Sequence, residues 1–92
     1  MAKMDIFVLD NLHQVIGEIN VNKPKFYHEL VKLLEEKKNN MPENYDIFII
    51  DKNNKEIMIK NEKEYNLIED MIFIRETNKD ILGKSIFEKN YN

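Results

Sequence analysis

The chain has 92 residues, which suits one compact domain and leaves no room for two. Its hydrophobic fraction of 42% and charged fraction of 34% are typical of a globular domain with a hydrated surface. The absence of cysteine excludes a disulfide framework and a thiolate metal site. The net charge is −3 and Arg75 is the only arginine, so no basic stripe indicates a nucleic-acid partner.

The longest apolar runs, such as residues 6–9, are far too short to cross a membrane. The first residues include no apolar stretch of signal-peptide length. We therefore expect a cytoplasmic protein, with a nuclear location as the alternative, and no membrane partner.

Residues 4–9 are mostly β-branched or aromatic and predict a first strand. Residues 10–14 have the composition of a turn, and 15–21 alternate between apolar and polar positions. The short connection indicates that the two strands form a hairpin.

A helix is predicted next, with Asn22 as its cap and Pro24 in its first turn. Its apolar stripe consists of Phe26, Leu30, Leu33 and Leu34. Residues 39–42, which include Pro42, are expected to end it.

Three more strands are expected after the helix, at residues 45–50, 56–60 and 71–75. A turn at 51–54 joins the first two, and a single helical turn is expected near 65–67. This order predicts an α+β domain in which one main helix packs on one face of a four- to five-stranded mixed sheet. The first and last strands should be parallel neighbours at its centre, because both are dense in Ile, Phe and Val.

Two segments carry a family resemblance. Met4-Asp5-Ile6-Phe7-Val8 resembles the opening strand of ubiquitin, and Glu64-Tyr65-Asn66-Leu67 is similar to the tyrosine-centred turn before its last strand. The resemblance to the ubiquitin-like (β-grasp) superfamily implies a domain over residues 1–76 and a C-terminal tail over 77–92. In that tail, the apolar residues have the spacing of one side of a short helix: Ile81, Leu82, Ile86 and Phe87.

A weaker resemblance is to the Phox-and-Bem heterodimerisation domains, whose acidic loop follows a strand. The matching stretch is 51–59, although Asn53 and Lys55 depart from the acidic pattern. This resemblance implies electrostatic docking through four carboxylates, namely Asp51, Glu56, Glu62 and Glu64.

The chain offers little for catalysis. Ser85 is its only serine and Thr77 its only threonine, while His13 and His28 fall on different predicted elements. No glycine-rich phosphate loop occurs. We therefore expect no enzymatic activity, no cofactor, no metal and no small-molecule substrate.

The strands carry more large apolar residues than one covered face requires. If alternate residues face the helix, five others point to the far side of the sheet: Phe7, Leu9, Phe48, Ile50 and Phe73. Monomers rarely leave such a patch uncovered, so it predicts a protein-binding or self-association site with Phe48 and Phe73 as anchors. A tail folded back over this patch is the alternative.

The sequence thus predicts a non-catalytic interaction or assembly domain, such as a scaffold or adaptor, whose partner is another protein or a second copy. Electrostatic heterodimerisation through the acidic stretch is one alternative. A ubiquitin-like modifier is the other. Because Gly17 and Gly83 are the only glycines, such a modifier would need processing after Gly83.

Overall fold

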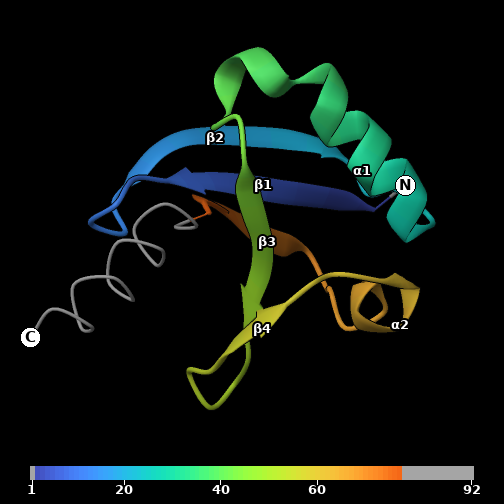
Figure 1. Cartoon of the computed structure of the whole chain (residues 1–92). Helices are drawn as coiled ribbons and strands as arrows, with labels where there is room; N and C mark the ends of the chain where they lie inside the picture. Colours follow the sequence, from blue (N-terminus) through green and yellow to red (C-terminus); the bar gives the residue numbers. More distant parts are fainter. Residues whose placement is uncertain (1, 78–92) are drawn as a thin grey trace, which may run out of the picture.

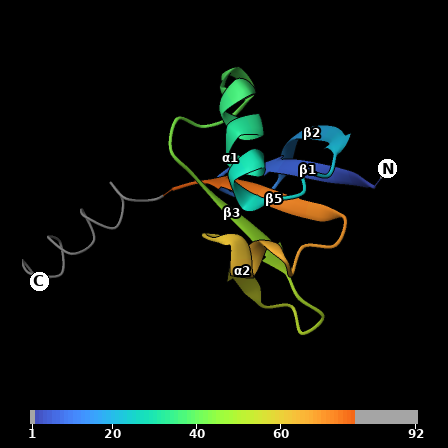
Figure 2. The same ribbon diagram turned by 90° about the vertical axis from the view of Figure 1, so that its right-hand side faces the viewer.

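The computed structural model describes residues 2–77. Their elements in chain order are β1 (Lys3–Leu9), β2 (Val15–Asn22), α1 (Tyr27–Glu36), the short 3₁₀ turn η1 (Lys38–Asn40), β3 (Tyr45–Ile50), β4 (Glu56–Met58), α2 (Glu62–Tyr65) and β5 (Met71–Glu76). Within this part of the chain the strands form one five-stranded sheet of order β2-β1-β5-β3-β4. Figures 1 and 2 show α1 lying across one face of that sheet. The predicted α+β arrangement is confirmed, and it is compatible with a β-grasp fold.

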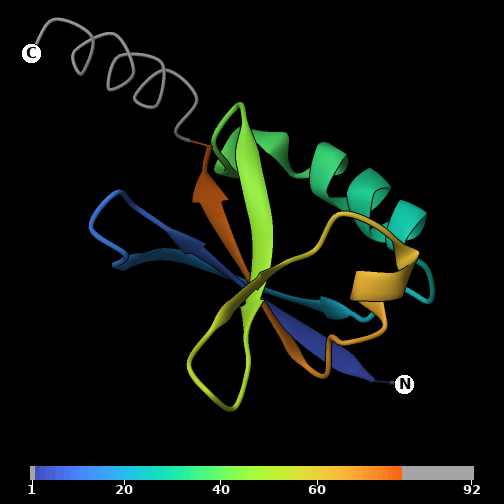
Figure 3. The same ribbon diagram turned by 60° about the horizontal axis from the view of Figure 1, so that its bottom comes forward.

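The first and last strands are parallel neighbours at the sheet centre, as predicted. Ile6 lies beside Ile72 and Val8 beside Ile74, and Figure 3 shows the two strands running side by side. All the other strand pairs are antiparallel. Parallel strands are commonly covered on both faces, so this central pair favours cover on the side opposite α1 as well.

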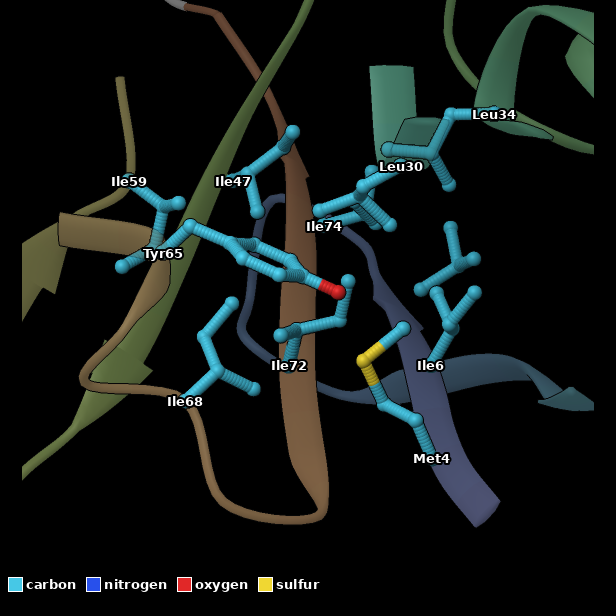
Figure 4. Packing of buried hydrophobic residues seen from close by; sticks show 11 residues of the cluster. Met4, Ile6, Leu30, Leu34, Ile47, Ile59, Tyr65, Ile68, Ile72 and Ile74 are labelled. Carbon is cyan, nitrogen blue, oxygen red and sulfur yellow. The ribbon is translucent and has the colours of Figure 1, made fainter. Parts of the chain in front are cut away.

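The hydrophobic core lies between the sheet and α1 (Figure 4). Leu30 and Leu34 of α1 are fully buried against the central strands. The other members of the cluster come from the strands and the segment around α2: Met4, Ile6, Val8, Ile47, Ile59, Tyr65, Ile68, Ile72 and Ile74. Burying each large aliphatic side chain contributes about 1.5–3 kcal/mol, so this cluster dominates the stability of the domain.

Helix α1 does not begin where the sequence predicted. Asn22 is the last residue of β2, and the helix starts at Tyr27 after Phe26, whose side chain cannot accept a hydrogen bond. The free backbone N–H groups are satisfied by two glutamates instead. Glu29 Oε1 accepts from Phe26 N at 3.1 Å, and the Glu62 carboxylate accepts from Tyr27 N at 3.0 and 3.1 Å. The predicted cap was wrong because a distant residue supplies one of these acceptors.

Helix α2 falls slightly earlier than the predicted helical turn. The Asn61 side chain caps it by accepting from Glu64 N at 2.9 Å. Tyr65 at its end is buried, and its hydroxyl donates to the Pro24 carbonyl. Burial raises the pKa of Tyr65, so the phenol keeps the proton that this bond requires. Together with the Glu62 cap, this bond joins α2 to the start of α1.

The β1–β2 and β3–β4 turns share one five-residue design. Asp10 Oδ1 accepts from the backbone N–H groups two and four residues later at 2.8 and 2.9 Å. Asp51 Oδ1 does the same at 2.7 and 2.9 Å. The fourth residue of each turn is left-handed, with φ of 63° at His13 and 64° at Asn54. A carboxylate at the first position therefore organises both hairpins.

We expect Asp10→Ala and Asp51→Ala each to lower the free energy of unfolding by about 1 kcal/mol, since each removes two side-chain-to-backbone hydrogen bonds. Urea denaturation followed by circular dichroism measures the change. Asp70→Ala is the matched control, because among residues 2–77 only the backbone carbonyl of Asp70 accepts a hydrogen bond and its carboxylate accepts none, so it should shift stability by less than about 0.5 kcal/mol. Equal losses in all three variants would show that the carboxylates do not organise the turns.

Candidate functional site

The sheet face opposite α1, here called the outer face, carries a row of three phenylalanines. The register sets Phe7 beside Phe73 and Phe73 beside Phe48. Their rings stack with centroids 5.7 and 5.4 Å apart. Met58 of β4 extends the row as the partner of Phe48. Four strands thus join in one continuous apolar band on this face, with aromatic pairs at favourable separations.

Two of the five residues predicted for this face are not accessible. Phe48 is only 1% exposed and Leu9 only 6%, although neither belongs to the cluster under α1. The guanidinium carbon of Arg75 lies 4.4 Å from the centroid of the Phe48 ring and covers it. The prediction of Phe48 as an exposed anchor is therefore wrong. Phe7 and Phe73 are half-buried, and Ile50 is 46% exposed.

Arg75 is held over Phe48 by contacts with the first residue of β4 and with the β1–β2 turn. Its Nη1 donates to Glu56 Oε2 at 2.9 Å and lies 3.2 Å from His13 Nε2. The hydrogen bond from Arg75 holds the pKa of Glu56 below its usual range. The arginine thereby links β5, β4 and the β1–β2 turn. Arg75 was not among the predicted site residues, although it alternates with Met71 and Phe73 along the last strand and so falls on the outer face.

The four carboxylates predicted for acidic docking each have a hydrogen-bond partner within the domain. Asp51 closes the β3–β4 turn, and Glu56 pairs with Arg75 on the outer face. Glu62 caps α1, and Glu64 Oε1 accepts from the Lys60 backbone N–H at 2.6 Å. Each carboxylate thus has an intramolecular partner that accounts for its position. Their role in docking stays a prediction, while their contacts within the domain offer a structural reason for their presence.

A groove of about 530 Å³ lies where β5 begins, between the segment after α2 and the β3–β4 hairpin. Phe73 and Ile57 are among its lining residues. Three large apolar side chains around it are substantially exposed: Ile50 at 46%, Leu67 at 53% and Met71 at 40%. The structure therefore brings the predicted residues Ile50 and Phe73 together here. Leu67 and Met71 were not among the predicted site residues.

Charged groups also line the groove. Asp51, Glu69 and Asp70 contribute carboxylates, and Lys52 contributes an amine. The lining thus combines apolar side chains with mainly acidic groups, a mixture that is also found in protein-binding surfaces with a hydrophobic centre and a polar rim.

The two histidines lie apart. His13 is in the β1–β2 turn, and His28 on α1 stacks on Phe26 with ring centroids 5.7 Å apart. In residues 2–77, no three side chains of the metal-binding kind come together, and no helix there is long and apolar enough to span a membrane. Ser85, Gly83 and the apolar residues predicted for a tail helix lie outside the described residues.

No protein-family model matches the chain, and no curated protein matches its sequence. The fold is therefore established by the arrangement of its strands and helix, whereas membership of the ubiquitin-like superfamily remains a prediction.

Replacing Glu56 by glutamine tests whether its ion pair with Arg75 stabilises the outer face. Because the folded-state pKa of Glu56 is lowered, its contribution is present above the unfolded-state pKa and is lost as pH falls through the folded-state value. We expect wild type to exceed Glu56→Gln in unfolding free energy at neutral pH by less than about 1 kcal/mol, since the Glu56 side chain is 41% exposed.

Urea denaturation at pH 7 and at a series of lower values down to about pH 3 measures how this difference shrinks as Glu56 takes up its proton. The two proteins should become nearly equal in stability at the acidic pH. A difference that stays constant between the two conditions would contradict a role for the Glu56 charge.

Proposed function

We propose that this domain is a non-catalytic protein-binding module whose groove at the start of β5 receives an apolar segment of a partner protein. The observation that carries the proposal is the grouping of Ile50, Leu67 and Met71, all substantially exposed, around one groove with Phe73 in its lining. An exposed apolar cluster with a polar border is typical of an interaction site.

Phe73, in the lining of the groove, is suited to binding because neighbouring side chains already hold it in place. Phe73 is stacked between Phe7 and Phe48, and Arg75 closes the far end of that row. A partner side chain that packs on Phe73 would therefore lose little conformational freedom of the domain itself. Phe73 replaces Phe48 as the central contact, with Ile50, Leu67 and Met71 supplying apolar area around it.

The proposal describes an adaptor or assembly domain of the ubiquitin-like kind. Acidic docking through Asp51, Glu56, Glu62 and Glu64 is a weaker candidate, since these carboxylates already have hydrogen-bond partners within the domain. The two mechanisms differ in their response to salt. Apolar binding changes little with ionic strength, whereas docking by opposite charges weakens steeply.

The experiment selects ligands from a phage-displayed library of random peptides and measures their affinity by isothermal titration calorimetry. The test variant is Ile50→Glu/Met71→Glu, which charges two exposed positions of the groove. Leu12→Glu is the matched control, because Leu12 is exposed in the β1–β2 turn and is not among the groove-lining residues.

We expect selected peptides to be apolar, to bind with a negative heat-capacity change, and to lose at least about tenfold in affinity in the test variant but not in the control. Peptides that bind both variants as well as wild type would refute the groove as the site. Acidic-surface binding would appear instead as basic peptides whose affinity falls with added salt.

A further inference from the structure

Strand β2 is one edge of the sheet, and it is much longer than the other edge strand. It has eight residues, whereas β4 at the opposite edge has three. Figure 2 shows β2 at the margin of the sheet beyond β1. A long edge strand presents a row of backbone donors and acceptors that can pair with another strand.

The hydrogen bonds around β1 identify which β2 residues direct their backbone groups outward. Asp5 N donates to Asp70 O at the start of the parallel pair, so Asp5 turns its backbone toward β5. Its neighbours along β1 therefore turn theirs toward β2, where they bond Ile19 and Val21. The Lys23 N to Ala2 O bond continues the same alternation.

The intervening residues of β2 face away from the sheet with their N–H and C=O groups. These are Glu18, Asn20 and Asn22, whose side chains are all exposed. Within residues 2–77 β1 is the one strand beside β2, so no other strand pairs with these outward groups. They form a regular set of three, spaced by two residues along one strand.

Few of the usual devices protect this edge. Strand β2 contains neither lysine nor proline, and Glu18 is its only charged residue. The register shift opposite Val8 and Leu9 leaves Ile16 as an extra residue, so the bulge guards only the start of the strand. Residues 17–22 remain a continuous segment that can accept another strand.

We propose that β2 pairs antiparallel with β2 of a second copy of this chain, about a two-fold axis through Asn20. In that register Asn20 meets Asn20 of the copy, and Glu18 meets Asn22. All three outward residues then pair with one another, each donating and accepting a backbone hydrogen bond. The two sheets become one continuous sheet across the interface, and the contact is self-complementary as a two-fold interface must be.

Other symmetric registers are less complementary. An axis through Glu18 sets two carboxylates directly opposite each other, which is destabilising. An axis through Val21 or Asn22 pairs an outward residue with Pro24, which has no N–H to donate. An axis through Ile19 pairs Asn22 with Ile16 in the bulge. Of these registers, only the one with its axis through Asn20 pairs Glu18, Asn20 and Asn22 entirely with one another and avoids like charges. This self-complementarity favours a second copy as the occupant.

The partly buried side chains of β2 support the same register. Ile19 and Val21 pack against the core on the α1 side of the sheet. Across the proposed interface Ile19 lies opposite Val21 of the copy, so two β-branched pairs become more completely buried. The pairing thus adds apolar contact to the backbone hydrogen bonds.

The test introduces a positive or a negative charge at Asn20. Light scattering of the full chain over a concentration series measures dimerisation. Wild type should form a concentration-dependent dimer. Asn20→Lys and Asn20→Glu should each weaken dimerisation at least about tenfold, because the axis sets like charges face to face. An equimolar mixture of the two variants should recover the dimer. Asn66→Lys, which adds the same charge at an exposed residue after α2, should dimerise as wild type.

Amide hydrogen exchange supplies a second readout. Dimerisation should protect the amides of Glu18, Asn20 and Asn22, and circular dichroism confirms that each variant is folded. A wild-type monomer throughout the series would overturn the proposal. This holds even if β2 then proves to accept a strand from a different protein. So would a dimer that the Asn20 variants leave intact, or variants whose mixture fails to associate.

Dimerisation through β2 can be tested separately from peptide binding in the groove. A dimer that survives Asn20→Lys but is lost in Ile50→Glu/Met71→Glu would place self-association at the groove and overturn pairing through β2. Conversely, a dimer sensitive only to Asn20 would leave peptide binding in the groove unaffected.

Discussion

The parallel pairing of β1 and β5 is the constraint on which the rest of the domain depends. It joins the two ends of the fold and sets Ile6, Val8, Ile72 and Ile74 against α1. The same pleat sends alternate residues of both strands to the other side, where parallel strands are commonly covered too. Side chains of the domain itself supply part of this cover. The three phenylalanines stack on the outer face, and Arg75 lies over Phe48.

Carboxylates perform most of the local organisation in this chain. They close both hairpin turns, satisfy the start of α1 and hold the arginine over Phe48. The carboxylates that make these contacts are spaced along the sequence in a pattern that resembles an acidic docking loop. In space the pattern separates into local contacts, and the apolar groove becomes the stronger candidate for recognition.

The sequence was sufficient to predict the order of elements from its periodicity and turn residues. It also predicted the central parallel pair, because the first and last strands are dense in Ile, Phe and Val. It was not sufficient to predict exposure on the other face. The burial of Phe48 depends on Arg75, a residue of a neighbouring strand that only the register brings near. The start of α1 depends on Glu62, which lies far along the chain. Leu67 joins the groove through a loop whose path no periodicity specifies.

The position of β5 in the chain has a consequence for synthesis. Because the last strand of the described domain fills the centre of the sheet, β1 and β3 have no lateral partner on that side until Glu76 is available. A chain emerging from the ribosome can form the hairpin and α1 early, but its sheet stays split into two halves. Folding therefore waits for contacts between distant segments, which slows it and prolongs the exposure of unpaired strands to chaperones or to aggregation.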